Sequence, residues 1–237
     1  MSELLVVGGT SGLGLEFVRV SVSQGNKVTV ISRRDIDLPG VMNVHCNLED
    51  LKAVDCVIQD LSISKIRFDS IIFFQRSRGS TEEDSWRNEF DVSVSSTRKF
   101  LQYSQTLLQQ HGNKSIVVVS SIAGTFVTRD APDSYQISKA ALRHLVKYYA
   151  FTLGRLGIRI NSVSPFAFVK DSSKDSFYSS QSWNNIMRQR IPLGRTCTLE
   201  DIINVIDFLL GQKSGYITGQ EIYVDGGVSL SLGVDLT

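Results

Sequence analysis

Short apolar runs, most of them rich in β-branched residues, recur along the chain and alternate with longer amphipathic stretches. Polarity does not alternate within the runs, which is typical of strands that are buried on both faces of a parallel sheet. The runs cover residues 4–7, 28–31, 42–46, 71–74, 116–120, 158–163 and 221–225. Because strands and helical stretches follow one another in turn, the sequence predicts an α/β fold with a doubly wound parallel sheet.

The stretches between these runs carry apolar residues at the spacing of a helix face. Examples are Leu51, Val54, Ile58 and Leu61 in one stretch, and Ile137, Ala141, Leu145 and Tyr149 in a later one. Thr198 and Asp201 have the spacing of a capping box, which predicts a helix over 199–210. His45 falls in a predicted strand, so we expect it to be packed. A polar, serine-rich segment at about 166–190 is long for a connection and is either a lid or a disordered stretch, of which we favour the lid.

Composition limits the classes of function. With 237 residues, 42% of them apolar, and no Pro- or Ser-rich linker, the chain is expected to form a single domain over 1–237. It carries 25 basic and 24 acidic residues, a balance that argues against nucleic acid or a membrane surface as a partner. Three cysteines without a CxxC pair and three scattered histidines predict neither a disulfide framework nor a metal site. The first apolar run is too short for a signal peptide and no run could span a membrane, so we expect a cytoplasmic protein.

The first predicted strand leads directly into the sequence GGTSGLG, which places glycines at positions 8, 12 and 14. A turn so rich in glycine lets the backbone approach a pyrophosphate, whose charge is met by the N–H groups of the helix that follows. The alternative is that these glycines only shape a tight turn between strand and helix. Their position after the first strand favours dinucleotide binding.

The second predicted strand ends in Ser32, Arg33 and Arg34. In dinucleotide-binding folds an acidic residue near this point binds the ribose 2′-hydroxyl, whereas an arginine accommodates a 2′-phosphate. The sequence therefore favours NADP(H) over NAD(H) as the cofactor. Solvated surface arginines are the alternative.

Tyr135 and Lys139 are four residues apart at the start of a predicted helix, so they share one helix face. A phenol titrates near pH 10 in water and is a poor acid–base catalyst at neutral pH. A positive charge about 4 Å away stabilises the phenolate by about 4 kcal/mol at an effective dielectric constant near 20. Ser121 follows the strand over 116–120, at the sheet edge where ligands of such folds bind. Its hydroxyl could hold a substrate carbonyl while Tyr135 protonates it.

These residues, with SSIAG before YQISK, GIRINSVSP and the late sequence SGYITGQEIYVDGG, resemble the short-chain dehydrogenase/reductase family over essentially the whole chain. The resemblance implies a Rossmann-type sheet of about seven strands and a small carbonyl or alcohol substrate that exchanges hydride with a nicotinamide cofactor. It also implies a homodimer or homotetramer. Its catalytic residues would be Ser121, Tyr135 and Lys139. The implied cofactor-binding residues are Gly8, Thr10, Ser11, Gly12, Leu13, Gly14, Ser32, Arg33, Arg34, Asn47, Leu48, Tyr135, Lys139 and Pro165.

Several positions depart from the family pattern. FQRSR stands at 74–78 where the family has Asn-Asn-Ala-Gly, Ser93 takes the place of an asparagine, and Phe166 replaces a glycine. These departures leave open a second hypothesis, that the chain is a catalytically weakened dinucleotide-binding sensor or assembly subunit. Arg76 and Arg78 are either solvated charges or an anion site, for a cofactor phosphate or an acidic substrate.

Overall fold

The computed structural model describes residues 1–77, 82–128, 131–166 and 189–230 of the chain. Its centre is a seven-stranded sheet in the order β3-β2-β1-β4-β5-β6-β7, and every neighbouring pair is parallel. The strands are β1 (Glu3–Val7), β2 (Lys27–Ser32), β3 (Val41–His45), β4 (Ser70–Phe73), β5 (Lys114–Val119), β6 (Ile158–Pro165) and β7 (Glu221–Val224). Each overlaps one of the predicted apolar runs, and the predicted Rossmann-type, doubly wound α/β class is confirmed.

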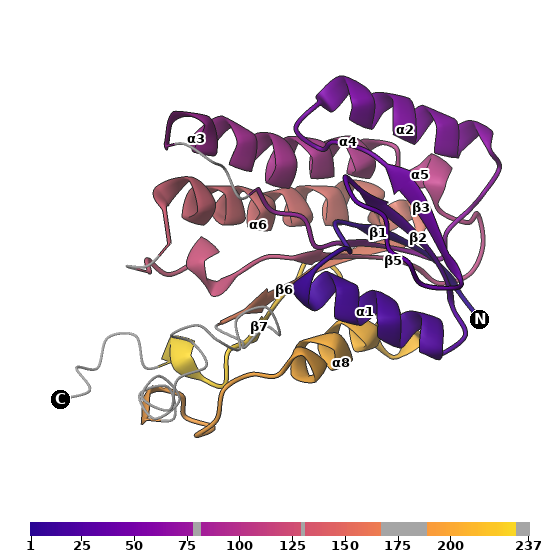
Figure 1. The fold of residues 1–237 in the computed structure, drawn as a ribbon. Coiled ribbons are helices and arrows are strands. Elements are labelled where there is room, and N and C mark those ends of the chain that lie inside the picture. Colours follow the sequence, from indigo (N-terminus) through magenta and orange to yellow (C-terminus); the bar gives the residue numbers. More distant parts are fainter. Residues whose placement is uncertain (78–81, 129–130, 167–188, 231–237) are drawn as a thin grey trace.

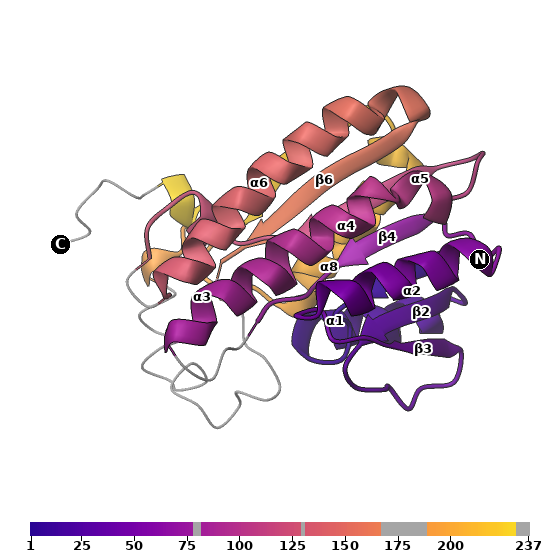
Figure 2. The same ribbon diagram turned by 90° about the horizontal axis from the view of Figure 1, so that it is seen from above.

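Helices cover both faces of the sheet. α2, α4 and α6 lie on one face and α1 and α8 on the other (Figure 1), and the turned view shows α4 between α2 and α6 (Figure 2). The helices are α1 (Gly12–Ser23), α2 (Leu51–Ile63), α3 (Glu82–Phe90), the π-helix η1 (Asp91–Ser95), α4 (Ser96–Gln102), α5 (Ser104–Leu107), α6 (Asp133–Leu153) and α8 (Leu199–Leu210), with short 3₁₀ turns η2 (Ile122–Gly124), η3 (Gly154–Leu156), η6 (Gln212–Ser214) and η7 (Val228–Leu230). The capping box at the start of α8 is present as predicted, because the Thr198 hydroxyl accepts from the Asp201 N–H and the Asp201 carboxylate accepts from the Thr198 N–H.

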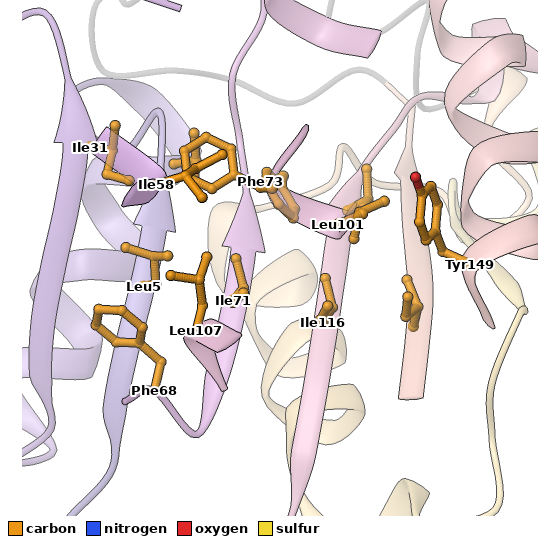
Figure 3. Close-up of a cluster of buried hydrophobic side chains, with 14 of the residues drawn as sticks. Leu5, Ile31, Ile58, Phe68, Ile71, Phe73, Leu101, Leu107, Ile116 and Tyr149 are labelled. Atoms are coloured by element: carbon orange, nitrogen blue, oxygen red, sulfur yellow. The ribbon is translucent and has the colours of Figure 1, made fainter. Parts of the chain in front are cut away.

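An apolar core lies on each face. On the α2–α4–α6 side, Leu5, Ile71 and Ile116 from neighbouring strands meet side chains of the covering helices (Figure 3). Burying each such side chain stabilises the fold by about 1.5–3 kcal/mol. The strands are thereby held rigidly, and so are the positions of the loops that follow them.

β3 is an edge strand, and its burial differs from that of the other strands. Its side chains are exposed or half-buried, and His45 is exposed. The expectation that His45 is packed was therefore wrong. The reason is that β3 is at the edge of the sheet and pairs with β2 on one side only.

The chain forms β1, β2 and β3 in order toward one edge of the sheet, then returns to pair β4 with β1 and continues through β5 and β6 to β7 at the other edge. The direction in which strands are added therefore reverses between β1 and β4. In open α/β sheets such a point leaves a crevice at the carboxyl ends of the strands. The backbone after β1 is tied to both neighbours there: the Gly8 N–H donates to the Ile31 carbonyl at 3.0 Å, and the Phe74 N–H donates to the Val7 carbonyl at 2.8 Å. A ligand site is therefore expected in this crevice.

Most of the predicted lid at 166–190 lies outside the described residues, since 167–188 are not among them. Within the part of the chain that the structure describes, no helix combines the length and the apolar character needed to cross a membrane.

Candidate active site

A cavity of about 600 Å³ opens at the carboxyl ends of β1, β2, β4 and β5. Its lining includes every residue to which the sequence assigned catalysis or cofactor binding: Gly8, Thr10, Ser11, Gly12, Leu13, Gly14, Ser32, Arg33, Arg34, Asn47, Leu48, Ser121, Tyr135, Lys139 and Pro165. The structure thus brings these residues together along one surface. Their roles in binding and catalysis remain predictions.

The glycine turn lies between β1 and α1 and is tightly packed. Gly8 has a φ of +84°, and a Cβ there would lie 2.7 Å from the Cα of Gln75, so a side chain would collide with the loop after β4. A Cβ on Gly14 would lie 2.9 Å from the Gly8 carbonyl oxygen. Ser11 is the N-cap of α1 but makes no side-chain capping hydrogen bond, and the first turn of α1 carries no acidic residue. The turn therefore fits an anionic pyrophosphate, whose oxygens would take the N–H groups that Ser11 does not cap.

The end of the cavity beyond β2 carries the predicted 2′-phosphate site. Ser32 is turned toward its own backbone, since its hydroxyl donates to the Arg34 carbonyl and accepts from the Arg34 N–H. Arg33 and Arg34 are exposed. The Arg33 Nη1 lies 3.6 Å from Oε1 of Glu49, an exposed ion pair of the kind that contributes little to stability. A ligand phosphate at Arg33 would compete with Glu49.

The other end of the cavity carries Ser121, Tyr135 and Lys139. β5 ends at Val119, one residue earlier than predicted, and Ser121 follows as the N-cap of η2, where its Oγ accepts from the Ala123 N–H at 3.2 Å. Tyr135 and Lys139 come from the first turns of α6, with Nζ of Lys139 5.5 Å from the centre of the Tyr135 ring. The ammonium group also donates to the Val119 carbonyl at 3.5 Å and is anchored beside the end of β5.

Sequence reasoning missed a buried carboxylate behind Lys139. Glu89, in α3, is only 5% exposed, and its Oε1 accepts from the hydroxyl of Ser93 at 2.5 Å and from that of Ser138 at 3.2 Å. Ser93 and Ser138 are fully buried. α3 and α6 lie side by side (Figures 1 and 2), which brings the carboxylate next to Lys139. The one signal in the sequence is the spacing of four residues between Glu89 and Ser93, which places both on one helix face.

The π-helix η1 follows Glu89 and places Ser93 inside the protein. In η1 the usual helical pattern is broken, and the hydroxyls of Ser96 and Thr97 donate to the carbonyls of Val92 and Ser93 at 2.6 and 2.7 Å. Such π-turns occur frequently at functional sites. Ser93, at the position where the family pattern has asparagine, therefore faces Glu89 rather than the cavity lining.

Lys139 is 3% exposed, and its charge is strongly affected by its surroundings. Burial lowers the pKa of Lys139 to about 8; the negative charge of Glu89 opposes this shift, and the positive charge of Arg76 adds to it. At neutral pH the ammonium form still predominates, and it lies against the Tyr135 ring. We infer that the negative charge of Glu89 favours the charged form of Lys139, against the effect of burial.

We expect Glu89→Gln to lower the pKa of Lys139 below its value of about 8 in the unmodified protein. Glutamine keeps an oxygen for the Ser93 and Ser138 hydroxyls but removes the charge, and a lost negative neighbour disfavours the ammonium form. Titration of the lysine side chains by NMR measures this value, and Lys139→Met identifies the signal. Glu49→Gln, which removes a carboxylate at the far end of the cavity, is the control. A pKa of Lys139 that stays the same or rises in Glu89→Gln would contradict the expectation.

The loop after β4 contributes Gln75, Arg76 and Ser77 to the cavity. The guanidinium carbon of Arg76 lies 4.9 Å from the centre of the Tyr135 ring. Arg78 lies outside the described residues.

Groups of three or more metal-ligating side chains are absent from the described residues.

Comparison with known proteins gives concordant matches. Residues 10–229 match a family model described as "Enoyl-(Acyl carrier protein) reductase". The chain is 30% identical to the D-erythrulose reductase of Gallus gallus over 244 residues, covering 96% of this chain and 95% of that protein. It is 29% identical to the L-xylulose reductase of Bos taurus over 234 residues, covering 94% of each. The structure of a short-chain type dehydrogenase/reductase from Mycobacterium ulcerans superimposes with a TM-score of 0.84 at 24% identity, covering 97% of this chain and 90% of that one.

Proposed function

The chain belongs to the short-chain dehydrogenase/reductase family, and from that premise we propose that it interconverts a carbonyl and an alcohol with Ser121, Tyr135 and Lys139 as its catalytic groups. As a member of the family it is an NAD(P)-dependent oxidoreductase. The observation that carries the proposal is the meeting of these three side chains, from the end of β5 and the start of α6, on the cavity that also contains the glycine turn.

Each group has a role that its surroundings support. The nicotinamide cofactor, when bound, supplies the hydride that reaches the carbonyl carbon. Tyr135 donates the proton that the carbonyl oxygen takes up. The Ser121 oxygen accepts from the Ala123 N–H, so its own hydrogen can donate to the same carbonyl oxygen. Lys139 stabilises the negative charge left on the phenol, and in the reverse direction the same groups accept the proton.

We propose NADP(H) as the preferred cofactor, with the pyrophosphate on the turn from Gly8 to Gly14 and the 2′-phosphate at Arg33 and Arg34. We expect Arg33→Asp to weaken NADPH binding by about 1.5–3 kcal/mol, because hydrogen bonds to a charged group are lost and repulsion is added. NADH binding should change much less. Isothermal titration with both cofactors measures the difference.

Glu49→Gln is the matched control for that variant. It frees Arg33 from its ion pair without adding repulsion, so NADPH should bind as well as before or more tightly. Equal affinity of the unmodified protein for NADPH and NADH would overturn the cofactor assignment.

We also propose a cytoplasmic homodimer or homotetramer that binds neither nucleic acid nor membrane. The outward face of α6 supports a subunit contact, since Ile137, Tyr148 and Phe151 are exposed on it. Sedimentation of the purified protein measures the oligomeric state.

The alternative function is a dinucleotide-binding sensor or assembly subunit that has lost turnover. The departures from the family pattern favour it, since residues 74–77 line the cavity and Ser93 donates to Glu89, which lies behind Lys139. A panel of ketones with NADPH, and of alcohols with NADP⁺, separates the two functions. Consumption of cofactor with any of them supports the reductase, whereas tight cofactor binding without turnover supports the alternative.

A further inference from the structure

We propose that Arg76 and Ser77, in the loop after β4, form an anion site at the catalytic end of the cavity, and that the substrate is a carbonyl compound carrying an acidic group. This inference rests on the proposed function and names the substrate class of the same site.

The placement of Arg76 is the first observation. Its guanidinium carbon lies 4.9 Å from the centre of the Tyr135 ring, while its side chain is exposed to the cavity. Among the described residues Arg76 has no acidic partner within ion-pair distance and no hydrogen bond. A guanidinium has a planar fork of donors that matches a carboxylate or a phosphate. Arg76 therefore presents an unused fork next to the proposed proton donor.

Two buried polar atoms beside Arg76 are the second observation. Ser77 and Gln75 are 5% and 7% exposed and line the cavity, yet Oγ of Ser77 and Oε1 of Gln75 lack a hydrogen-bond partner. Buried polar atoms in proteins nearly always have a partner. Two exceptions, on either side of an unpaired arginine, indicate that a ligand supplies the missing partners.

The amide of Gln75 is held in one orientation. Its Nε2 donates to the Thr97 hydroxyl at 2.6 Å, and that hydroxyl in turn donates to the Ser93 carbonyl, so the amide oxygen is the atom left without a partner. An amide oxygen accepts hydrogen bonds and does not bind an anion; it suits an N–H or O–H group of a ligand. Ser77 can donate, so within the loop Arg76 and Ser77 are the groups that bind the anion.

The charge of the whole cavity agrees with this assignment. Its described lining contains Arg33, Arg34, Arg76 and Lys139 and no acidic residue. A cleft lined by charge of one sign attracts ligands of the opposite sign. A nicotinamide dinucleotide accounts for the glycine turn and for Arg33 and Arg34, and Lys139 has its proposed role in catalysis and cofactor binding. Arg76 is the remaining cation of the lining, and neither role uses it.

The position of Arg76 also decides between the two anions that the sequence left open. The proposed phosphate sites are the turn after β1, with the N–H groups at the start of α1, and the end of β2, with Arg33 and Arg34 in the cavity lining. Arg76 contacts Tyr135, whose hydroxyl must reach the reacting carbonyl oxygen. An anion held by Arg76 therefore lies within a few bonds of that carbonyl, on the substrate. Short oxo acids and phosphorylated ketones have this arrangement.

Matched pairs of substrates test the proposal: acetoacetate with its methyl ester, and dihydroxyacetone phosphate with dihydroxyacetone. With NADPH, we expect the anionic member of at least one pair to have a kcat/KM larger by about 10- to 150-fold, the range of charged hydrogen bonds. Which pair shows the difference distinguishes a carboxylate from a phosphate. Arg76→Met should remove this preference mainly through KM, and Arg76→Lys should restore part of it. Lys213→Met, which removes an exposed cation outside the cavity, should leave the preference unchanged.

The outcomes separate this inference from the proposed function. If neutral ketones are reduced and neither anion is preferred, or if Arg76→Met slows both members of each pair equally, the anion site is wrong and the reductase stands. If cofactor binds but no carbonyl is reduced, the proposed function fails, and the anion site is then tested by binding alone. Isothermal titration of acetoacetate and dihydroxyacetone phosphate into the NADP⁺ complex should show binding that Arg76→Met abolishes. Absence of binding, or a Kd that Arg76→Met leaves unchanged, overturns the inference.

Discussion

Tyr135→Phe should lower kcat for carbonyl reduction by about 10²- to 10⁴-fold, the usual contribution of a general acid–base catalyst. The substitution removes one oxygen and keeps the ring that Arg76 and Lys139 contact, so the cavity should keep its shape. Cofactor affinity should stay within a few-fold of the unmodified value. Steady-state rates and titration of NADPH measure the two quantities separately.

Tyr148→Phe is the matched control for this prediction. Tyr148 lies on the same helix, α6, is exposed, and does not line the cavity, so its loss of a hydroxyl should leave turnover unchanged. If Tyr135→Phe keeps more than half of the unmodified rate, Tyr135 is not the acid–base group.

Lys139→Met should damage turnover and cofactor binding together. Methionine fills a similar volume but removes the charge beside Tyr135 and the hydrogen bond to the Val119 carbonyl. A charge at this range is worth at most about 4 kcal/mol at an effective dielectric constant near 20, so we expect kcat to fall by up to about 10³-fold. If Lys139 also binds the cofactor, as the family resemblance implies, the Kd for NADPH should rise about 10-fold through the loss of a charged hydrogen bond.

Turnover should depend on pH through the charge of Lys139. With its pKa lowered to about 8, Lys139 is charged below that pH and neutral above it. We therefore expect turnover of the unmodified protein to fall as the pH rises through about 8, and Glu89→Gln to move this fall to lower pH. Lys139→Met should lack it. A melting temperature that falls sharply in Lys139→Met would show unfolding instead, and an unchanged kcat in a folded variant would contradict the assignment.

Local patterns in the sequence were sufficient for much of the fold and for part of the site. Runs of apolar residues predicted the strands because a strand buried on both faces needs apolar side chains at every position. The capping box at Thr198 and the pairing of Tyr135 with Lys139 involve residues three and four positions apart, so helix geometry alone places them together. The glycine turn is likewise formed by residues that are close together in the sequence.

The buried face of α6 could be predicted in this way only in part. Of the residues that the apolar spacing indicated, Tyr149 is buried and Leu145 packs against the core, whereas Ile137 is 46% exposed. The structure also buries Ser138, Lys139, Leu142 and Val146. The start of α6 packs beside α3, where Glu89 and Ser93 offer polar partners. A polar side chain is buried where another element meets its hydrogen bonds, and the spacing of apolar residues contains no information about that element.

The sequence by itself determined the family, the order of strands and helices, and the residues that share one turn of backbone. Only the tertiary structure placed Glu89 against Ser138, which is 49 residues away along the chain, and Arg76 over the ring of Tyr135. The physical reason is that hydrogen bonds and charge effects act over a few ångströms in space, whatever the separation along the chain. Which charges meet is settled when the sheet brings the ends of β4 and β5 and the start of α6 to one cavity.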